Sequence, residues 1–298
     1  MLPCGKQVLG PSSLVLGPMG LPSLRRAAVA GSWYPASPDA LVREVDRYLK
    51  AVDRSPAGEA IAIVAPHAGL MYSGPIAAHA YSLLAGRDIE VAVLVGPSHY
   101  VGFEGVALYG RGAFETPLGT MPIAESCASA IALASRRVRE HATAHVREHS
   151  LEMQLPFLKR VLPEAAIVPL VMGRQDRETA YELGEAIAAG VAGRRAVLIA
   201  STDLSHYQNA ATAVKLDSKV IEQVRRFDAA GLMSALEAFP DLACGGGPTV
   251  SVMLAARALG ARDARVLKYG DSGDVSGDKD AVVGYLAAAF GTFAPERN

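Results

Sequence analysis

The sequence has few cysteines, no long hydrophobic run and no excess of positive charge. Its three cysteines, at positions 4, 127 and 244 of 298 residues, are too few and too far apart for a disulfide framework, which favours a cytoplasmic setting. No apolar run approaches the roughly 20 residues of a membrane-spanning helix. A net charge of -1 argues against a nucleic-acid partner, because nucleic-acid binders usually carry a basic face.

Several familiar site motifs are also absent. The chain has no phosphate-binding loop, no dinucleotide fingerprint and no Gly-x-Ser-x-Gly nucleophile elbow. The acidic, glycine-rich stretch at 270–280 lacks the ligand spacing of a calcium-binding hand. A functional site must therefore be built from another arrangement of residues.

The first 25 residues differ in composition from the rest of the chain. They are rich in Gly, Pro, Ser and Leu, and their positive charge follows the apolar part instead of preceding it. This order favours a disordered leader over a secretion signal. Residues 26–298 show no repeat or linker, and 50% of the whole chain is hydrophobic, so we expect one globular domain.

Strand-like and helix-like segments alternate along this domain, which predicts an α/β fold with a mixed or largely parallel sheet. Short apolar runs are typical of strands that are buried on both faces. The expected strands are 26–31, 60–66, 91–98, 105–109, 166–172, 196–200, 265–269 and 281–290. The expected helices are 38–52, 75–84, 123–135, 177–189, 211–227 and 229–238. A further helix is expected to be capped by Ser150 and to turn Leu151, Leu155, Leu158 and Leu162 inward. The last expected helix follows the loop 241–248 and ends at residue 259. Loops are expected at 114–119 and 270–280.

Three of the apolar runs end in ionisable residues. His67 follows the first, His99 the second, and the third leads into Asp203 and His206. Ligands of open α/β sheets bind beyond the carboxyl ends of the strands, so these side chains point to a shared site. Imidazole is a common ligand of Fe, Zn and Cu, whereas a single such histidine would more simply be structural. Asp203 and His206 fit an acid/base pair, with a stabilised turn as the alternative.

Cys244 is a further candidate, because three glycines and a predicted helix follow it. A helix N-terminus lowers the pKa of a thiol, and the thiolate binds metals and attacks electrophiles. The alternative is a small buried hydrophobe, which is also the interpretation of Cys127. His141 and His145 stand among charged residues and are predicted on a solvated surface, whereas His149 precedes Ser150 and is placed at the cleft.

Seven motifs taken together resemble the Memo family, whose microbial members are called AmmeMemoRadiSam system protein B. The resemblance covers about residues 27 to 290. The motifs are Ala30-Gly-Ser-Trp-Tyr-Pro35, Pro66-His-Ala-Gly69 with Tyr72-Ser-Gly74, Gly96-Pro-Ser-His99, Thr116-Pro-Leu-Gly119, Glu148-His-Ser-Leu-Glu152, Ser201-Thr-Asp-Leu-Ser-His206 and Cys244-Gly-Gly-Gly-Pro248.

The resemblance implies a three-layer αβα sandwich similar to class III extradiol ring-cleaving dioxygenases. It implies a metal set of His67, His99 and Cys244, with catalytic His206 and Asp203 beside it. Tyr72, Gly245, Gly246 and His149 would line the cleft. The dioxygenases hold Fe(II) with two histidines and a carboxylate, so a cysteine in the third position argues against catechol cleavage. Fe(II) is the expected metal, with Cu or Zn as alternatives.

The resemblance also implies partners, namely an AMME-domain protein and a radical SAM protein. The leading hypothesis is metal-dependent redox or oxygen chemistry on a small molecule or protein group. One rival is a non-catalytic adaptor that binds a peptide or protein in the same cleft, since the eukaryotic member of the family is known as an adaptor in receptor-tyrosine-kinase signalling. The other is a hydrolase with Cys244 as nucleophile and His206 as base.

Overall fold

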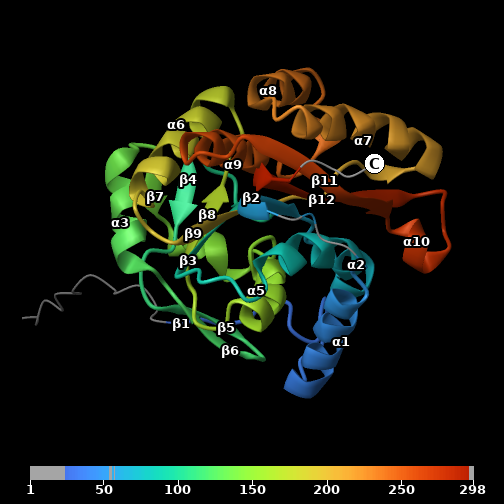
Figure 1. The fold of residues 1–298 in the computed structure, drawn as a ribbon, viewed down its shortest axis with the longest axis horizontal. Coiled ribbons are helices and arrows are strands. Elements are labelled where there is room, and N and C mark those ends of the chain that lie inside the picture. Colours follow the sequence, from blue (N-terminus) through green and yellow to red (C-terminus); the bar gives the residue numbers. More distant parts are fainter. Residues whose placement is uncertain (1–23, 54–55, 57, 295–298) are drawn as a thin grey trace, which may run out of the picture.

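The computed structural model describes residues 24–53, 56 and 58–294 (Figure 1). Residues 1–23 of the expected leader lie outside the described residues. Leu24 and Arg25, which that prediction also included, form a short strand, β1 (Leu24–Arg25), and the Arg25 side chain is buried.

A mixed sheet of nine strands forms the centre of the described chain. Four parallel strands lie in its middle, in the order β2 (Gly58–Ala65), β9 (Ala196–Ser201), β3 (Val91–Pro97) and β8 (Ala166–Met172). On one side β12 (Val282–Phe293) is antiparallel to β2 and pairs with β10 (His206–Gln208) and β11 (Asp263–Asp271). On the other side β4 (Val106–Leu108) is antiparallel to β8 and pairs with β7 (Val138–Glu140).

Helices cover both faces of this sheet, which gives three layers (Figure 1). One layer packs on the β2–β9–β3 face and extends over β11 and β12. It contains α3 (Glu125–Ala134), α6 (Arg177–Gly190), α7 (Ala210–Arg225), α8 (Ala229–Ala238) and α9 (Gly246–Ala258). The opposite layer contains α1 (Pro38–Lys50), α2 (Leu70–Tyr81) and α5 (Leu155–Val161). The α/β class and the sandwich architecture are thereby confirmed.

The central strands are apolar throughout because both of their faces are covered. Val93 and Leu94 in β3 and Ile199 in β9 are all fully buried, although successive side chains point to opposite faces. Cys127 in α3 is buried too, as expected. The predicted strands and helices of the sheet's centre agree with the structure to within a few residues.

Two segments near the start of the chain differ from their predictions. Residues 26–31, expected as a strand, are irregular, because the backbone N–H groups of Ala28 and Val29 donate to the Glu152 carboxylate instead of a neighbouring strand. Residues 114–119, expected as a loop, belong to a hairpin of β5 (Ala113–Thr116) and β6 (Gly119–Pro122), which joins β1 in a second, three-stranded sheet.

Two helix starts also differ. Helix α2 begins at Leu70, five residues earlier than expected, and Gly74 allows it to approach α1, because a Cβ there would lie 2.7 Å from the Tyr48 ring. Ser150 does not cap a helix: its hydroxyl donates to the carbonyl of Pro97 (2.9 Å), and a 3₁₀ turn, Glu152–Gln154, precedes α5. The four leucines expected to face inward from this region are all buried, namely Leu151, Leu155, Leu158 and Leu162.

The prediction of a solvated surface at His141 and His145 is wrong. His145 lies in α4 (Ala142–Val146), only 1% exposed, and its Nε2 donates to the carbonyl of Ala107 (3.1 Å). His141 is half-buried, with its ring against Phe103. Arg139, Glu140 and Arg147 are exposed while both imidazoles turn inward, which a count of charges along the chain does not reveal.

Three shorter features complete the fold. Strand β10 begins at His206, and the loop 270–280 contains a single helical turn, α10 (Gly273–Ser276). A 3₁₀ turn, Ser82–Leu84, extends α2. Among the residues that the structure describes, no helix is both long enough and apolar enough to cross a membrane.

Candidate metal centre

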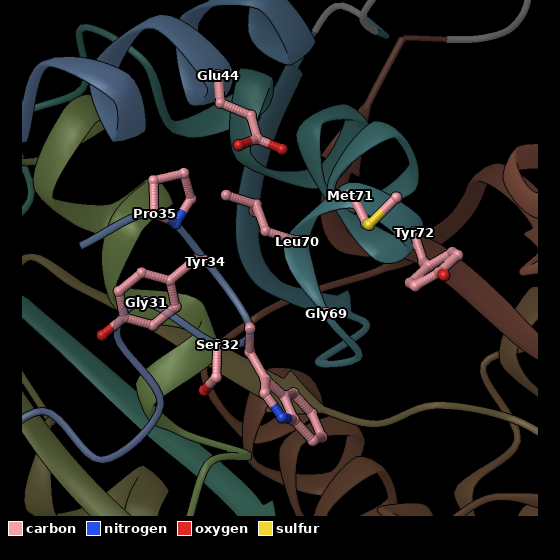
Figure 2. Close-up of a pocket in the computed structure, with 10 residues that line it drawn as sticks. Gly31, Ser32, Tyr34, Pro35, Glu44, Gly69, Leu70, Met71 and Tyr72 are labelled. Atoms are coloured by element: carbon pink, nitrogen blue, oxygen red, sulfur yellow. The ribbon is translucent and has the colours of Figure 1, made fainter. Parts of the chain in front are cut away.

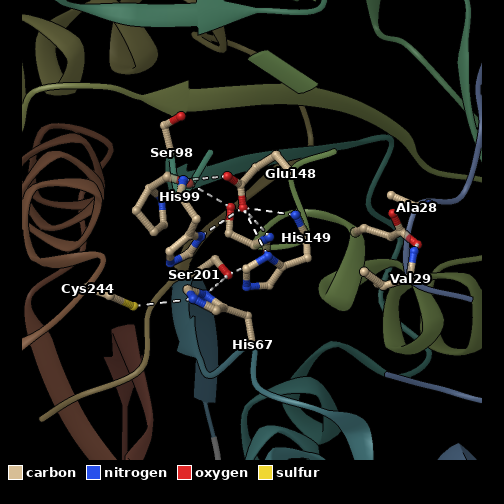
Figure 3. Close-up of polar contacts among 12 residues, drawn as sticks. Ala28, Val29, His67, Ser98, His99, Glu148, His149, Ser201 and Cys244 are labelled. Carbon is tan, nitrogen blue, oxygen red and sulfur yellow. Dashed lines mark hydrogen bonds and ion pairs between the residues drawn. The ribbon is translucent and has the colours of Figure 1, made fainter. Parts of the chain in front are cut away.

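Three histidines meet at the carboxyl edge of the parallel strands. His67 follows β2 and His99 follows β3, while His149 arrives from the segment that precedes α5 (Figure 3). Each offers one ring nitrogen, and these three atoms lie within 4.8 Å of one another. The ring centroids are 5.2 Å apart for His67 and His99 and 4.5 Å apart for His99 and His149. Such a cluster is able to hold a metal ion.

The hydrogen bonds around His67 fix which of its nitrogens is free. Ser201 gives its only hydroxyl proton to the carbonyl of Ser150 (2.7 Å), so its oxygen accepts from His67 Nδ1 (2.9 Å). Gln154 Nε2 also donates to this oxygen (2.7 Å), and Tyr81 holds the amide from the other side. His67 therefore carries its proton on Nδ1 and presents the Nε2 lone pair to the cluster.

Glu148 orients His99 in the same way. Its Oε1 accepts from His99 Nδ1 (2.9 Å), and its other oxygen accepts from the His99 backbone N–H (2.6 Å). The backbone N–H groups of His149 and Ser150 donate to Oε1 as well. Burial alone would raise the pKa of Glu148, but the hydrogen bonds from His99 and Ser150 lower it to about 2. The ionised carboxylate keeps the proton on His99 Nδ1 and leaves Nε2 as a ligand atom.

His149 is the third member, and its ring is held by packing. The ring lies 4.2 Å from that of Trp33 and 5.6 Å from that of His67, measured between centroids. Its buried Nδ1 has no hydrogen-bond partner in the described chain and lies 3.6 Å from Glu148 Oε1. A buried imidazole with unused hydrogen-bonding capacity fits a ligand whose partner is a cation.

The protonation states suit metal binding. Burial, and then the charge of neighbouring histidines, lowers the pKa of His67 and of His149 to about 3 each. Both are therefore neutral at pH 7, and neutral imidazole is the form that binds metals. The donor set of three ring nitrogens, two of them oriented by oxygen acceptors, fits a transition-metal ion.

Cys244, expected in the metal set, lies directly beside it. Its Sγ is 3.3 Å from His67 Nε2 and accepts from the Asp203 backbone N–H, also at 3.3 Å (Figure 3). Burial, followed by the charge of Asp203, raises the pKa of the Cys244 thiol. The three-residue cluster thus contains His149, which the sequence analysis placed only at the cleft, and Cys244 adjoins it through His67.

Asp203 and His206 occupy different surroundings. The Asp203 carboxylate accepts the His67 backbone N–H (2.8 Å) and has a pKa raised by burial to about 6. In the described chain, no hydrogen bond joins its carboxylate to the His206 ring. His206 is half-buried in β10 and shares a cavity of about 660 Å³ with His99 and Cys244. Asp203 thus supports the His67 turn, and His206 faces the open space.

The remaining cleft candidates lie at the starts of α9 and α2. Gly245 is buried and allows α9 to start against β9, because a Cβ there would overlap the carbonyl oxygen of Ser201, whereas Gly246 packs against Leu236 of α8. Tyr72 lines a separate cavity with Trp33. Glu148 received no role from sequence reasoning, although its place directly before His149, in one of the motifs that carry the family resemblance, was an available signal.

Comparison with known proteins finds matches over nearly the whole chain. A family model described as "Memo-like protein" matches residues 25–289. A MEMO1 family protein from Methanopyrus kandleri is 41% identical over 278 residues, which is 89% of this chain and 98% of the relative. One from Methanosarcina mazei is 40% identical over 267 residues, with 89% and 98% covered. One from Thermotoga petrophila is 37% identical over 276 residues, again with 89% and 98% covered.

Proposed function

This chain belongs to the Memo-like protein family, and we propose that it holds a metal ion at His67, His99 and His149. Fe(II) is the first choice and Cu or Zn the alternatives, because imidazole nitrogen suits all three. The proposal depends on one observation, the convergence of three ring nitrogens within 4.8 Å.

The surrounding residues support a role in chemistry on a small molecule. When bound, Fe(II) or Cu would supply electron exchange and open coordination positions for substrate and oxygen, whereas Zn has no redox chemistry. The cavity of about 660 Å³ beside His99 has the size of a small-molecule site. His206 borders this cavity, where it would take or give a proton, while Glu148 and Ser201 hold the ligand rings in place.

The test is a metal measurement on the protein purified without a histidine tag. After anaerobic reconstitution with Fe(II), Cu or Zn, we expect one equivalent of metal by elemental analysis. His67→Ala and His99→Ala should each weaken binding at least about tenfold, whereas His79→Ala, in α2 and outside the cluster, should not. A protein that retains no stoichiometric metal under any of these conditions would contradict the proposal.

The third ligand is tested by a matched pair of variants. If His149 completes the set, His149→Ala loses the metal and Cys244→Ser keeps it. The reverse result would establish the His67, His99 and Cys244 set that the family resemblance implies. The Cys244 Sγ lies 3.3 Å from His67 Nε2, so this alternative ligand set is also compatible with the geometry.

A second candidate function is a non-catalytic adaptor that holds a peptide or protein in the cleft. Two exposed aromatic residues on the same cavity favour it: the exposed fractions of Tyr207 and Phe239 are 78% and 54%. Aromatic residues are enriched in protein interfaces. The adaptor predicts that His67→Ala preserves partner affinity with no metal present, and a loss of affinity on metal removal would contradict it.

The hydrolase alternative has less support. Its nucleophile would be a Cys244 thiolate, but burial and the Asp203 charge raise the pKa of this thiol. We expect iodoacetamide to label Cys244 slowly at neutral pH in the metal-free protein. Rapid labelling of Cys244 would instead support the hydrolase.

The family resemblance also carries proposals about the cellular context. We propose a cytoplasmic protein that associates with an AMME-domain protein and a radical SAM protein. Co-expression of the three chains followed by affinity purification tests this association, and a failure to co-purify at physiological salt would count against it.

A further inference from the structure

A second cavity, lined in part by Trp33, is distinct from the cavity beside His99. It has a volume of about 480 Å³ and is bordered by the segment 31–35, by α1 and by the start of α2 (Figure 2). Trp33 borders both the cavity and the metal centre, since it lines this cavity and its ring contacts that of His149. The Leu70 N–H donates to the carbonyl of Trp33 (2.8 Å), which ties two walls together. The volume is in the range of small-molecule sites.

The walls of this cavity contain one charged residue. Glu44 in α1 is the only ionisable acid or base in the lining apart from tyrosine, and its carboxylate faces the same space as Leu70 and Met71 (Figure 2). Its Oε1 accepts from the Tyr48 hydroxyl (2.9 Å), and within the described ranges no basic side chain forms an ion pair with it. The half-buried Glu44 carboxylate can therefore form an ion pair with a cation that is not part of this chain.

Two aromatic rings in the same lining are also free of cations. Elsewhere in the described chain, arginine or lysine lies over aromatic rings, as Arg147 does over Tyr100 and Lys219 over Phe239. No such pair involves Trp33 or Tyr72 in the part of the chain that the structure describes. Indole and phenol faces attract cations, and aromatic surfaces of this kind recognise ammonium groups in many proteins.

We propose that this cavity binds a small organic cation that carries an alkylammonium group. Glu44 would pair with the positive charge, Trp33 and Tyr72 would contact the ammonium methyl or methylene groups, and Leu70 and Met71 would cover the alkyl part. An anion is excluded by the charge of Glu44. A metal ion is a poor occupant, because the lining offers a single carboxylate and no imidazole.

The chain provides its own probe for this cavity, because Trp33 is its only tryptophan. The experiment titrates metal-free protein with choline and follows the tryptophan emission. Its neutral isostere, 3,3-dimethylbutan-1-ol, has the same shape without the charge and serves as the matched ligand. We expect a saturable change with choline and at least about tenfold weaker binding of the isostere.

Matched variants assign the effect to the cavity. Glu44→Gln keeps an acceptor for Tyr48 but removes the charge, and it should weaken choline binding about fivefold or more. Asp39→Asn removes one charge from the exposed first turn of the same helix and should leave binding unchanged. Tyr72→Leu keeps the Glu44 charge and should also weaken binding, which covers the case of a Glu44 variant that fails to fold.

Three outcomes would overturn the proposal. The first is equal binding of choline and its neutral isostere, which would make the cavity a simple apolar site. The second is equal binding by Glu44→Gln and Asp39→Asn. The third is no saturable change in emission together with no ligand contact in saturation-transfer NMR. Since the protein is metal-free throughout, none of these results depends on the metal proposal.

Discussion

Glu148 is the single residue on which the geometry of the metal ligands most depends. Its carboxylate binds the side chain and backbone of His99 and the backbone of His149 and Ser150. The side chain is 1% exposed and its pKa is lowered to about 2, so it stays ionised at all working pH values. A carboxylate behind a metal-bound imidazole fixes its tautomer and raises its basicity.

We therefore predict that Glu148→Gln weakens metal binding by about 10- to 100-fold, the usual effect of losing such a partner. A competition titration against a chelator of known affinity measures the change. Glu115→Gln is the control, because Glu115 pairs with the exposed Arg26 on the small sheet and not with a ligand. Equal affinities for the two variants would show that Glu148 does not act on the metal.

The burial of His145 predicts how the stability of the protein depends on pH. Burial lowers its pKa to about 3, whereas a histidine in the unfolded chain has a pKa of about 6.5. Between these values the unfolded state binds one more proton, so the free energy of unfolding falls by about 1.4 kcal/mol per pH unit as the pH decreases below about 6.5. His67 and His149 add to the same slope in metal-free protein.

Urea unfolding from pH 8 to pH 4.5 tests this contribution. His145→Leu should be destabilised at pH 8 by lost packing and by the lost bond to Ala107, but its slope below pH 6 should be smaller by about 1.4 kcal/mol per pH unit. If the variant and the parent lose stability in parallel, His145 is not neutral in the folded protein.

At the scale of elements, Cys244 reaches the site where the start of α9 meets the end of β9. The first turn of α9 contacts the end of the strand so closely that a Cβ on Gly245 would overlap the Ser201 carbonyl oxygen and lie 2.8 Å from Thr202. The Gly245 N–H donates to the Thr202 hydroxyl (2.9 Å). This contact places Cys244 beside His67.

We predict that Gly245→Ala destabilises the protein by about 1–3 kcal/mol, because overpacking against backbone forces the helix and strand apart. The substitution is compatible with the local φ of -112°, so the cost comes from the contact and not from backbone strain. Thermal unfolding measures it, with Gly102→Ala as control, since a Cβ there meets nothing within 4 Å. Equal melting temperatures would contradict the packing argument.

At the scale of the whole molecule, the proposed metal would link distant parts of the chain. His67, His99 and His149 come from three separate segments, two of which end central strands of the sheet. A ligand that binds only where these segments meet favours the folded state over the unfolded one. Its effect should therefore appear in global stability.

We expect the free energy of unfolding to rise by about 2.7 kcal/mol at a free metal concentration of 100 times the dissociation constant. Denaturant unfolding with and without metal measures this rise. His99→Ala should abolish it, whereas His79→Ala should retain it. An unchanged midpoint in the parent protein at saturating metal would contradict the linkage.

The sequence by itself determined the architecture and part of the site. Continuous apolar runs identified the central strands, because strands buried on both faces must be apolar on both. The rule that parallel strands present their carboxyl ends at one edge brought His67, His99 and the segment at Asp203 together before any coordinates. These two predictions require only the local pattern of apolar residues and the parallel direction of the strands.

Only the tertiary structure decided which side chains turn toward that edge. His145 and His149 are four residues apart in similarly charged surroundings, yet one packs against Tyr109 and Phe114 and the other joins His67 and His99. Glu148 orients the His99 ring and binds the His149 backbone through hydrogen bonds that the spacing of residues along the chain does not predict. The direction of a side chain outside regular strands is set by long-range packing and hydrogen bonding, which the linear order of residues does not contain.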